Sequence, residues 1–249
     1  MPIEMDTRSY EPRYYRLWSV DKDMVSFTVV LKETDLYIRA KRNLHNKALA
    51  VVKKQRALLE NYIKRHPGFV TAMEPSVAGD DAPLIVKTMV EASTKAGVGP
   101  MASVAGAIAE YTGRELINYS SEVIVENGGD IFLKTEKKRL IGIYVGATPY
   151  TGKIALEIIP EQTPVGICTS SGTIGHSTSY GNADAAIVIS KSTALADAVA
   201  TATGNMVNND NDVQRAIEAA RSIDGVTGVI IIKDDKMALW GDVKIVPVI

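Results

Sequence analysis

The chain has 249 residues, of which 46% are hydrophobic, with a mean hydropathy of +0.02 and a formal net charge of −1. This length is enough to bury a sizeable core in one large domain or two small ones. With no global basic excess, a nucleic-acid partner is not expected, and the apolar runs are far shorter than the roughly 20 residues of a membrane helix. The single cysteine, Cys168, excludes an internal disulfide framework and a multi-cysteine zinc site within one chain.

Residues 1–24 are rich in tyrosine and charge without a clear period, and are predicted to form an N-terminal arm. They hold acids, arginines and prolines where a secretory signal would need an uninterrupted apolar stretch, so we expect a cytoplasmic protein. Residues 25–249 are expected to form one domain, with a division near residue 97 as an alternative. The sequence is compatible with a homo-oligomer and does not determine the oligomeric state.

Hydrophobic patterning predicts a β-hairpin followed by helices. Val25–Leu31 and Thr34–Ala40 have the β-branched and alternating apolar residues of two paired strands. Leu44–Ile63 has apolar residues at helical spacing, and His66-Pro67 closes this segment. Pro83–Lys95 is predicted to be a second helix, with proline near its start.

The rest of the chain alternates helical and strand-like segments. Met101–Leu116 is rich in alanine and glycine, which predicts a helix with an unusually slim surface. The next four apolar runs are separated by turn residues and predict an antiparallel meander, after which strands flank a polar loop. Together these elements predict a mixed α/β (α+β) fold. The expected meander strands are Val123–Val125, Ile131–Lys134, Leu140–Val145 and Ile154–Ile159; the later strands are Val165–Cys168, Ala185–Ile189, Val226–Ile232, Met237–Trp240 and Val243–Val248; and the later helices are Thr193–Met206 and Asn211–Ser222.

The segment Gly97–Ala102 formally fits the dinucleotide-binding pattern G-x-G-x-x-G/A. That pattern requires a preceding strand, whereas Glu91–Ala96 is predicted to be helical, and Pro100 lacks a backbone donor. A glycine that ends one helix, followed by a proline that begins the next, is the favoured alternative. Both interpretations place a helix N-terminus here, where an anion can bind. The candidate ligand-binding residues of this region are Gly99, Met101 and Gly106.

The segment Asn127-Gly128-Gly129-Asp130 lies between two predicted strands. Asn-Gly is a strong signal for a tight hairpin turn, and a turn alone explains most of the motif. The turn does not require Asp130, and an acid at the lip of a two-glycine turn can face a ribose, a metal ion or water. All four residues are candidates for ligand binding.

The segment Thr169–Ser179 has eight hydroxyl or imidazole side chains in eleven residues. It follows a predicted buried strand, and its two glycines allow close backbone approach, which suits phosphate binding by N–H and O–H donors. Ordinary surface loops have similar compositions. His176 is a candidate acid or base near neutral pH, although a single loop histidine is more often a surface residue. The candidate ligand-binding residues here are Thr169, Ser170, Ser171, Gly172, Ser177 and Ser179.

Asp197 and Thr201 are four residues apart on an alanine-rich predicted helix and therefore share one face. A buried carboxylate is costly unless it is paired, hydrogen-bonded or bound to a cation. Two interpretations are equally compatible with the spacing. Asp197 either bonds to neighbouring backbone, or binds Mg²⁺ with Thr201 as a second oxygen ligand.

Cys168 precedes the polar loop on a predicted buried strand. A structural thiol is the favoured interpretation, because only His176 lies near enough in sequence to lower its pKa. It is also the only thiol in the chain that can serve as a nucleophile.

Taken in order, these segments resemble the ApbE-like superfamily, whose characterised members are FAD:protein FMN transferases. The similar segments are VENGGDI (Val125–Ile131), GICTSSGTIGHSTSYG (Gly166–Gly181) and ADAVATATGN (Ala196–Asn205). ETDLYI (Glu33–Ile38) and GVGPMASVAGAIAE (Gly97–Glu110) are similar to a cytoplasmic branch of unknown function found in archaea and bacteria. The likeness runs from the region of Val25 to the C-terminus and implies a T-fold-like arrangement of layered sheets and helices.

The resemblance also implies a metal and a ligand. In the flavin transferases a D-A-x-x-T helix motif supplies Mg²⁺ ligands, and Asp197 and Thr201 occupy its Asp and Thr. The family segment G-A-I-A-K-G lies along the FAD site and lends a backbone carbonyl to the metal. Gly106–Ala109 matches its first four residues, which makes Ala107 the candidate carbonyl. Mg²⁺ with FAD, FMN or another nucleotide is therefore the implied cofactor set.

Three departures from the flavin transferases bear on function. The lysine of G-A-I-A-K-G is replaced by Glu110 and the following glycine by Tyr111. The T-S-G segment matches Ser170–Gly172, but the stretch that ends in H-I-x-D-P is reduced to Gly175–Ser177, whose His176 is the candidate catalytic histidine. Flavin transferases are commonly exported and modify a Thr or Ser of a partner, whereas no export signal is recognised here.

Three functions are compatible with these features. The first is an ApbE-like protein, potentially a transferase, that binds Mg²⁺ and a flavin, nucleotide or other anionic phosphate ligand. The second is a cytoplasmic factor in sulfide assimilation or homocysteine synthesis, an association that this branch resembles in archaea, with Cys168 as the first residue to test. The third is a metabolite-binding protein without enzymatic activity.

Overall fold

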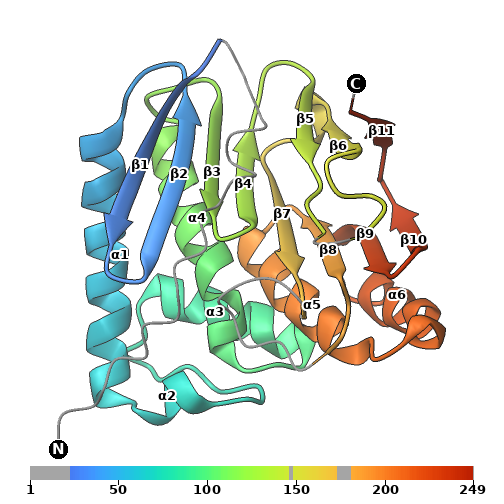
Figure 1. Cartoon of the computed structure of the whole chain (residues 1–249). Helices are drawn as coiled ribbons and strands as arrows, with labels where there is room; N and C mark the ends of the chain where they lie inside the picture. The colour runs from blue at the N-terminus through green and yellow to red at the C-terminus, as the bar shows by residue number, and fades with distance from the viewer. Residues whose placement is uncertain (1–22, 146–147, 173–180, 249) are drawn as a thin grey trace, which may run out of the picture.

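The computed structural model describes residues 23–145, 148–172 and 181–248. Its largest element is an eight-stranded sheet in the order β1-β2-β3-β4-β7-β8-β9-β10, in which all neighbouring strands are antiparallel (Figure 1). The predicted first hairpin is confirmed with its bounds, as β1 (Val25–Leu31) and β2 (Thr34–Ala40). The other strands of this sheet are β3 (Val123–Asn127), β4 (Asp130–Lys134), β7 (Val165–Ser170), β8 (Ala185–Ser190), β9 (Val226–Lys233) and β10 (Lys236–Gly241).

A second, three-stranded sheet covers one face of the large sheet. It has the order β11-β6-β5 and consists of β5 (Arg139–Gly142), β6 (Ile154–Ile158) and β11 (Ile245–Pro247). The predicted meander is therefore wrong beyond β4, because β4 pairs with β7 and the β5–β6 hairpin leaves the large sheet. The reason is the hydrophobic effect. Isoleucines of β7, β8 and β9 lie on the face of the large sheet that the helices do not cover, and isoleucines and a leucine of the β5–β6 hairpin pack on them to form a second core.

The opposite face of the large sheet is covered by helices (Figure 1). In α1, Ala48, Val52 and Leu59 of the predicted apolar stripe are buried, whereas Val51 and Ile63 are half-buried and Leu58 is exposed. These layers agree with the predicted α+β fold class, with helices on one side of the large sheet and a small sheet on the other. The helices are α1 (His45–Arg65), α2 (Gly68–Thr71), α3 (Leu84–Ala96), α4 (Val104–Leu116), α5 (Thr193–Met206) and α6 (Val213–Arg221), with short 3₁₀ turns at Pro100–Ser103, Pro160–Gln162 and Asp210–Asp212.

The junction between α3 and α4 resolves the two interpretations of Gly97–Ala102. Gly97 ends α3 in the left-handed conformation, with φ of 71°, and Pro100 opens the 3₁₀ turn that leads into α4. The dinucleotide-fingerprint interpretation is therefore wrong, because a helix and not a strand precedes the glycines. The predicted helix Met101–Leu116 is in fact a 3₁₀ turn followed by α4.

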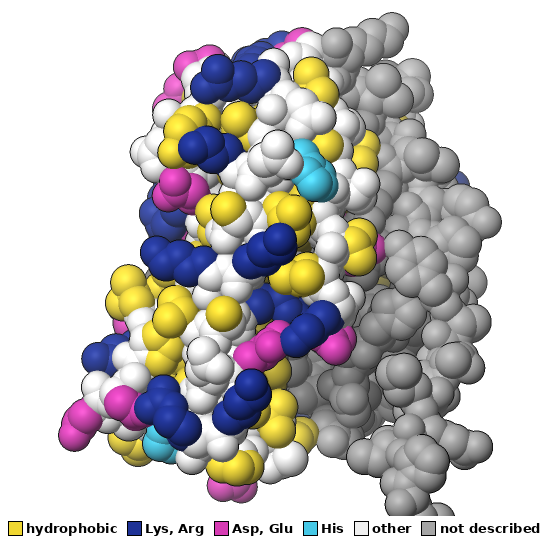
Figure 2. Space-filling view, turned by 90° about the vertical axis from the view of Figure 1, so that its left-hand side faces the viewer, with side chains coloured by type: hydrophobic (Ala, Val, Ile, Leu, Met, Phe, Trp, Pro, Cys, Tyr) yellow, Lys and Arg dark blue, Asp and Glu magenta, His cyan; other side chains and the backbone are white. Residues whose placement is uncertain are grey.

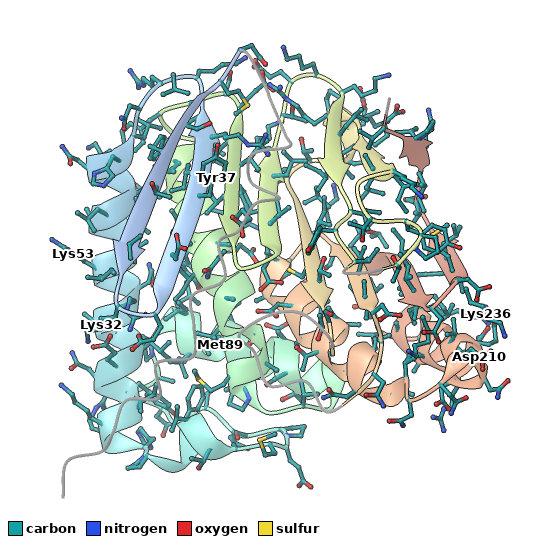
Figure 3. The ribbon with its side chains drawn as sticks, in the orientation of Figure 1. Lys32, Tyr37, Lys53, Met89, Asp210 and Lys236 are labelled. Carbon is teal, nitrogen blue, oxygen red and sulfur yellow. The ribbon has the colours of Figure 1, made fainter. Side chains whose placement is uncertain are left out.

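Charged side chains of α1 lie on the surface, and apolar side chains of α3 lie in the interior. Figure 2 views the side formed by α1, whose exposed lysines include Lys47, Lys53, Lys54 and Lys64. In Figure 3, Lys53 points outward from α1, whereas Met89 of α3 is fully buried among the helices. None of the helices in the described ranges has both the length and the apolar character needed to cross a membrane.

Candidate functional site

One peptide group at the start of α4 is held from two sides by residues that the sequence singled out. The Asn127 side chain, at the end of β3, donates through Nδ2 to the carbonyl oxygen of Ala105 at 3.0 Å. The next N–H, that of Gly106, donates to Oδ2 of Asp197 on α5 at 2.8 Å. Three elements that are distant in sequence therefore meet at the N-terminal turn of α4, and all three carry predicted site residues.

The absence of a side chain at Gly106 allows α4 and α5 to approach closely. A Cβ atom at this position would lie 2.4 Å from the carbonyl oxygen of Thr193 and 2.7 Å from Cβ of Asp197. Both distances are shorter than van der Waals contact permits, so no larger residue fits without moving a helix. The predicted slim surface of α4 therefore has a packing function at the site, which is to bring Asp197 within hydrogen-bonding distance of α4.

Two buried carboxyl groups, those of Asp130 and Asp197, form an acidic cluster near the buried Cys168 thiol. Burial raises the pKa of Asp197 well above its ordinary value, and the nearby Asp130 carboxylate raises it further, against the opposing effect of N–H donors from Gly106 and Ala105. Burial likewise raises the pKa of the Cys168 thiol, and the charges of Asp130 and Asp197 add to this effect. Cys168 is completely buried and donates through Sγ to the carbonyl oxygen of Thr193 at 3.3 Å. Its surroundings are those of an inert thiol and disfavour a thiolate nucleophile.

The Asn127–Asp130 segment forms the tight turn between β3 and β4. Gly128 and Gly129 have φ of 70° and 109°, conformations that glycine adopts without strain. The Gly129 N–H donates to Oε1 of Glu126 at 3.1 Å. A Cβ at Gly129 would be 3.8 Å from the carbonyl oxygen of Thr169, so the turn adjoins the end of β7, as Figure 1 shows for the β3–β4 turn and the lower end of β7.

The hydroxyl-rich segment begins at Thr169 and Ser170, the last two residues of β7, and Ser170 lies next to Gly204 of α5. Gly172 packs against Gly181, and Gly181 packs against Gly204 of α5: a Cβ on either of the first two glycines would lie within 2.0 Å of the next glycine's carbonyl oxygen. Gly172 and Gly181 therefore lie together, next to the C-terminal half of α5. His176, Ser177 and Ser179 lie outside the described residues.

The other predicted site residues differ in their placement. Ala107 is fully buried in the first turn of α4, and Thr201 is half-buried one helical turn after Asp197. Met101 is half-buried in the 3₁₀ turn. Gly99 makes a structural contact, because a Cβ there would lie 1.8 Å from the carbonyl oxygen of Ala72.

Glu110 is a residue of this region that the sequence marked only as a departure from a motif. It is buried on α4, and its Oε2 accepts hydrogen bonds from the N–H groups of Thr193 and Ala194 at 2.7 and 3.2 Å. The only sequence signal was an acid one helical turn after Gly106, on a helix face made of small residues. Its partners lie on another helix and cannot be identified from periodicity.

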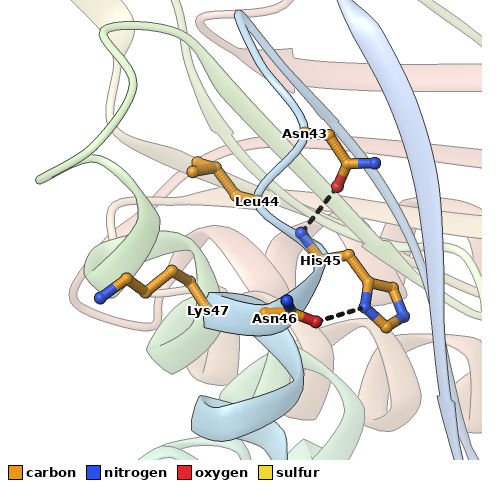
Figure 4. Close-up of a pocket in the computed structure, with 5 residues that line it drawn as sticks. All are labelled: Asn43, Leu44, His45, Asn46 and Lys47. Carbon is orange, nitrogen blue, oxygen red and sulfur yellow. Dashed lines mark hydrogen bonds between the residues drawn. The ribbon is translucent and has the colours of Figure 1, made fainter.

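A separate pocket of about 460 Å³ lies at the N-terminus of α1, away from these residues (Figure 4). The Asn43 side chain accepts from the His45 N–H at 2.9 Å, and Asn46 bonds to the His45 ring at 3.4 Å. None of the predicted site residues lines it. The lining residues are Asn43, Leu44, His45, Asn46 and Lys47.

The chemistry of the acidic cluster fits a hard cation. Asp130 and Asp197 offer carboxylate oxygens, and oxygen ligands are those that Mg²⁺ prefers. The other predicted ligands, Thr201 and Ala107, lie one turn after Asp197 on α5 and in the first turn of α4. Within the described ranges, no three or more His, Cys, Asp or Glu side chains are grouped to hold a metal ion. A cation here would therefore depend on two carboxylates and on other kinds of oxygen.

Comparisons with known proteins agree with this architecture. A family model described as AbpE bacteria matches residues 16–238. A UPF0280 protein of Methanococcus aeolicus is 38% identical over 226 residues, which covers 88% of this chain and 91% of the relative. A UPF0280 protein of Methanopyrus kandleri is 40% identical over 227 residues, with 88% and 91% covered.

Two solved structures share the fold at low sequence identity. The apo flavinyl transferase ApbE of Pseudomonas stutzeri aligns with a TM-score of 0.55 and 12% identity, over 87% of this chain and 94% of that one. The ApbE protein of Thermotoga maritima aligns with a TM-score of 0.53 and 12% identity, over 88% and 96%. The matched family model, the relatives that extend over nearly the whole chain, and the shared layers lead to one conclusion. The chain belongs to the AbpE bacteria family, as a UPF0280 member of the ApbE-like superfamily.

Proposed function

We propose that this protein binds a nucleotide or a related phosphate ligand together with Mg²⁺, at the site where α4, the β3–β4 turn and α5 meet. The observation that carries the proposal is the pair of buried carboxylates, Asp130 and Asp197, placed close enough for one to raise the pKa of the other. Two like charges in a buried site oppose each other's ionisation, and a divalent cation between them would offset this cost.

The N-terminus of α4 supports the same interpretation. A helix N-terminus carries partial positive charge, which favours an anionic group nearby. Asn127 and Asp197 hold the first turn of α4 in place by bonding the Ala105–Gly106 peptide. A phosphate bound here would lie beside the cation, and its oxygens would complete the shell that the two carboxylates begin.

Flavins rank first among the ligands to test. The two aligned structures are ApbE proteins, and one of them is described as a flavinyl transferase. We infer ligand binding ahead of flavin transfer, because the lysine of the family's G-A-I-A-K-G segment is Glu110 here and is bonded to α5.

The direct test is native mass spectrometry and a visible spectrum of the freshly purified protein, followed by calorimetric titration with FAD, FMN and ATP. We expect at least one of these ligands to bind, and to bind more tightly in MgCl₂ than in EDTA. Asp130→Asn and Asp197→Asn should each weaken Mg²⁺-dependent binding by about tenfold or more. Asp224→Asn, which removes a fully exposed carboxylate, is the matched control and should bind as the wild type does.

Binding that is unaffected by EDTA, or by both Asp substitutions, would contradict the proposed metal site. Failure of FAD, FMN and ATP to bind at all would contradict the nucleotide assignment.

A further inference from the structure

Two acidic side chains join α4 and α5 in opposite directions. Asp197 of α5 accepts the N–H of Gly106 on α4 at 2.8 Å. One turn later on α4 and one turn earlier on α5, Glu110 accepts the N–H of Thr193 at 2.7 Å. Each helix therefore has one carboxylate that accepts a hydrogen bond from the backbone of the other helix.

Glu110 makes more contacts than a surface acid would. Its Oε2 also accepts from the Ala194 N–H at 3.2 Å and the Ser192 hydroxyl at 3.1 Å. Its Oε1 accepts from Nε of Arg114 at 2.8 Å. The carboxylate thus caps the first turn of α5, where a negative charge interacts favourably with the helix dipole.

The first turn of α5 is restrained on several sides at Thr193. Its N–H bonds to Glu110, and its carbonyl oxygen accepts from Sγ of Cys168 at 3.3 Å. Gly106 and Gly166 allow α4 and β7 to press against it, since a Cβ at either glycine would lie 2.4 Å from a Thr193 atom. Asp197 follows Thr193 by one helical turn, and Thr201 follows by two. The contacts that fix Thr193 therefore also fix the position of Asp197 and Thr201 along the axis of α5 and their rotation about it.

We propose that Glu110 is a positioning residue for the cation site: by capping α5 it holds Asp197 and Thr201 where they bind the metal. This inference rests on the metal site proposed above. The proposed role requires the Glu110 side chain to be long enough to accept a hydrogen bond from the Thr193 N–H.

The test is titration of the full-length protein with MnCl₂ alone, with free Mn²⁺ followed by electron paramagnetic resonance. Glu110→Ala should weaken Mn²⁺ affinity about 10–100-fold, the usual effect of removing a group that orients a metal ligand. Glu110→Gln keeps the reach and an acceptor oxygen without the charge, and should retain most of the affinity. Glu110→Asp keeps the charge and loses the reach, and should lose more affinity than the Gln variant.

Two controls separate positioning from general damage. Arg114→Ala removes the half-exposed partner of Glu110 and should bind Mn²⁺ as the wild type does. Glu122→Gln breaks a buried ion pair at the other end of β3 and should lower stability without lowering Mn²⁺ affinity.

The outcomes are distinguishable. If the wild type binds no Mn²⁺, the proposed cation site itself fails. If the wild type binds and Glu110→Asp binds equally well, the positioning role is wrong, whether or not Glu110→Ala folds. A loss in Glu122→Gln as large as the loss in the Glu110 variants would overturn the positioning role in favour of a general stability effect.

Discussion

Asp197 shows how a single residue can satisfy two interpretations of its sequence context. Its spacing from Thr201 was equally compatible with a backbone-bonding acid and a Mg²⁺ ligand. The structure confirms the first through the 2.8 Å hydrogen bond from Gly106. The same bond orients one carboxylate oxygen and leaves the metal interpretation as a proposal, supported by the proximity of Asp130.

Cys168 provides a prediction at the same scale. Burial and the nearby carboxylates raise its pKa, and a thiol rather than a thiolate reacts slowly with disulfide reagents. We expect Ellman's reagent to leave Cys168 unmodified in the folded protein at mildly alkaline pH, and to label it fully after unfolding in guanidinium. Rapid labelling of the folded protein would contradict this view and would restore Cys168 as a candidate for sulfur chemistry.

Among the elements, the contact between α4 and α5 is set by one missing side chain. The exposed part of α4 would tolerate any good helix former, but Gly106 faces the backbone of Thr193. The identity of this residue is therefore governed by the neighbouring helix. Helix propensity favours alanine here, and packing forbids it.

Gly106→Ala tests which effect is larger. The gain in helix propensity is about 1 kcal/mol, whereas forcing a methyl group into a filled contact costs about 1–3 kcal/mol. The new Cβ would also push Asp197 from its hydrogen bond, so we expect a net loss in the free energy of unfolding, measured in urea. Gly68→Ala, where an added Cβ meets no atom within 4 Å, is the control and should be close to neutral. A Gly106→Ala protein as stable as the wild type would show that the helices can separate without cost.

For the whole molecule, an ion network centred on the buried Arg139 and Glu122 connects the two sheets at the end opposite the candidate site. Arg139, at the start of β5, pairs with Glu122 at 2.7 Å and with Asp23 at 3.0 Å. Lys41, just after β2, pairs with Glu122 at 2.6 Å. Glu122 immediately precedes β3, so the network joins strands of the large sheet to the first strand of the small one. It lies about five residues of strand, or roughly 17 Å, from the β3–β4 turn.

This network predicts a pH-dependent stability. Burial alone would raise the pKa of Glu122, but hydrogen bonds from Lys41, Thr135 and Arg139 outweigh it and lower the pKa from 4.5 to about 2. A group whose pKa is lowered by folding stabilises the protein above its unfolded pKa, and this stabilisation is lost as the pH falls toward the folded value.

Glu122→Gln should therefore cost about 3 kcal/mol at neutral pH. The difference from the wild type should shrink steadily below about pH 4.5, measured as urea unfolding at several pH values. A difference that stays constant with pH would mean that the Glu122 charge does not contribute to stability.

The sequence alone was sufficient for features that depend on short stretches of chain. The β1–β2 hairpin, helix α1, the Gly97–Pro100 junction and the Asn127–Asp130 turn follow from periodicity and turn chemistry, which act over a few residues. The family motifs also predict that Asp197 and Thr201 belong to one metal site, which stays a prediction.

Only the tertiary structure decided which of these features meet. The β5–β6 hairpin moved to a second sheet because the outer isoleucines of the large sheet needed cover, a requirement that no local pattern records. Gly106 and Asp197 are separated by 91 positions in the sequence, and Glu110 and Thr193 by 83, so their hydrogen bonds arise from the packing of α4 on α5. In the sequence, Glu110 is recognisable only as the absence of the family's lysine. In the folded protein, its carboxylate bonds to the first turn of α5, the helix that carries Asp197.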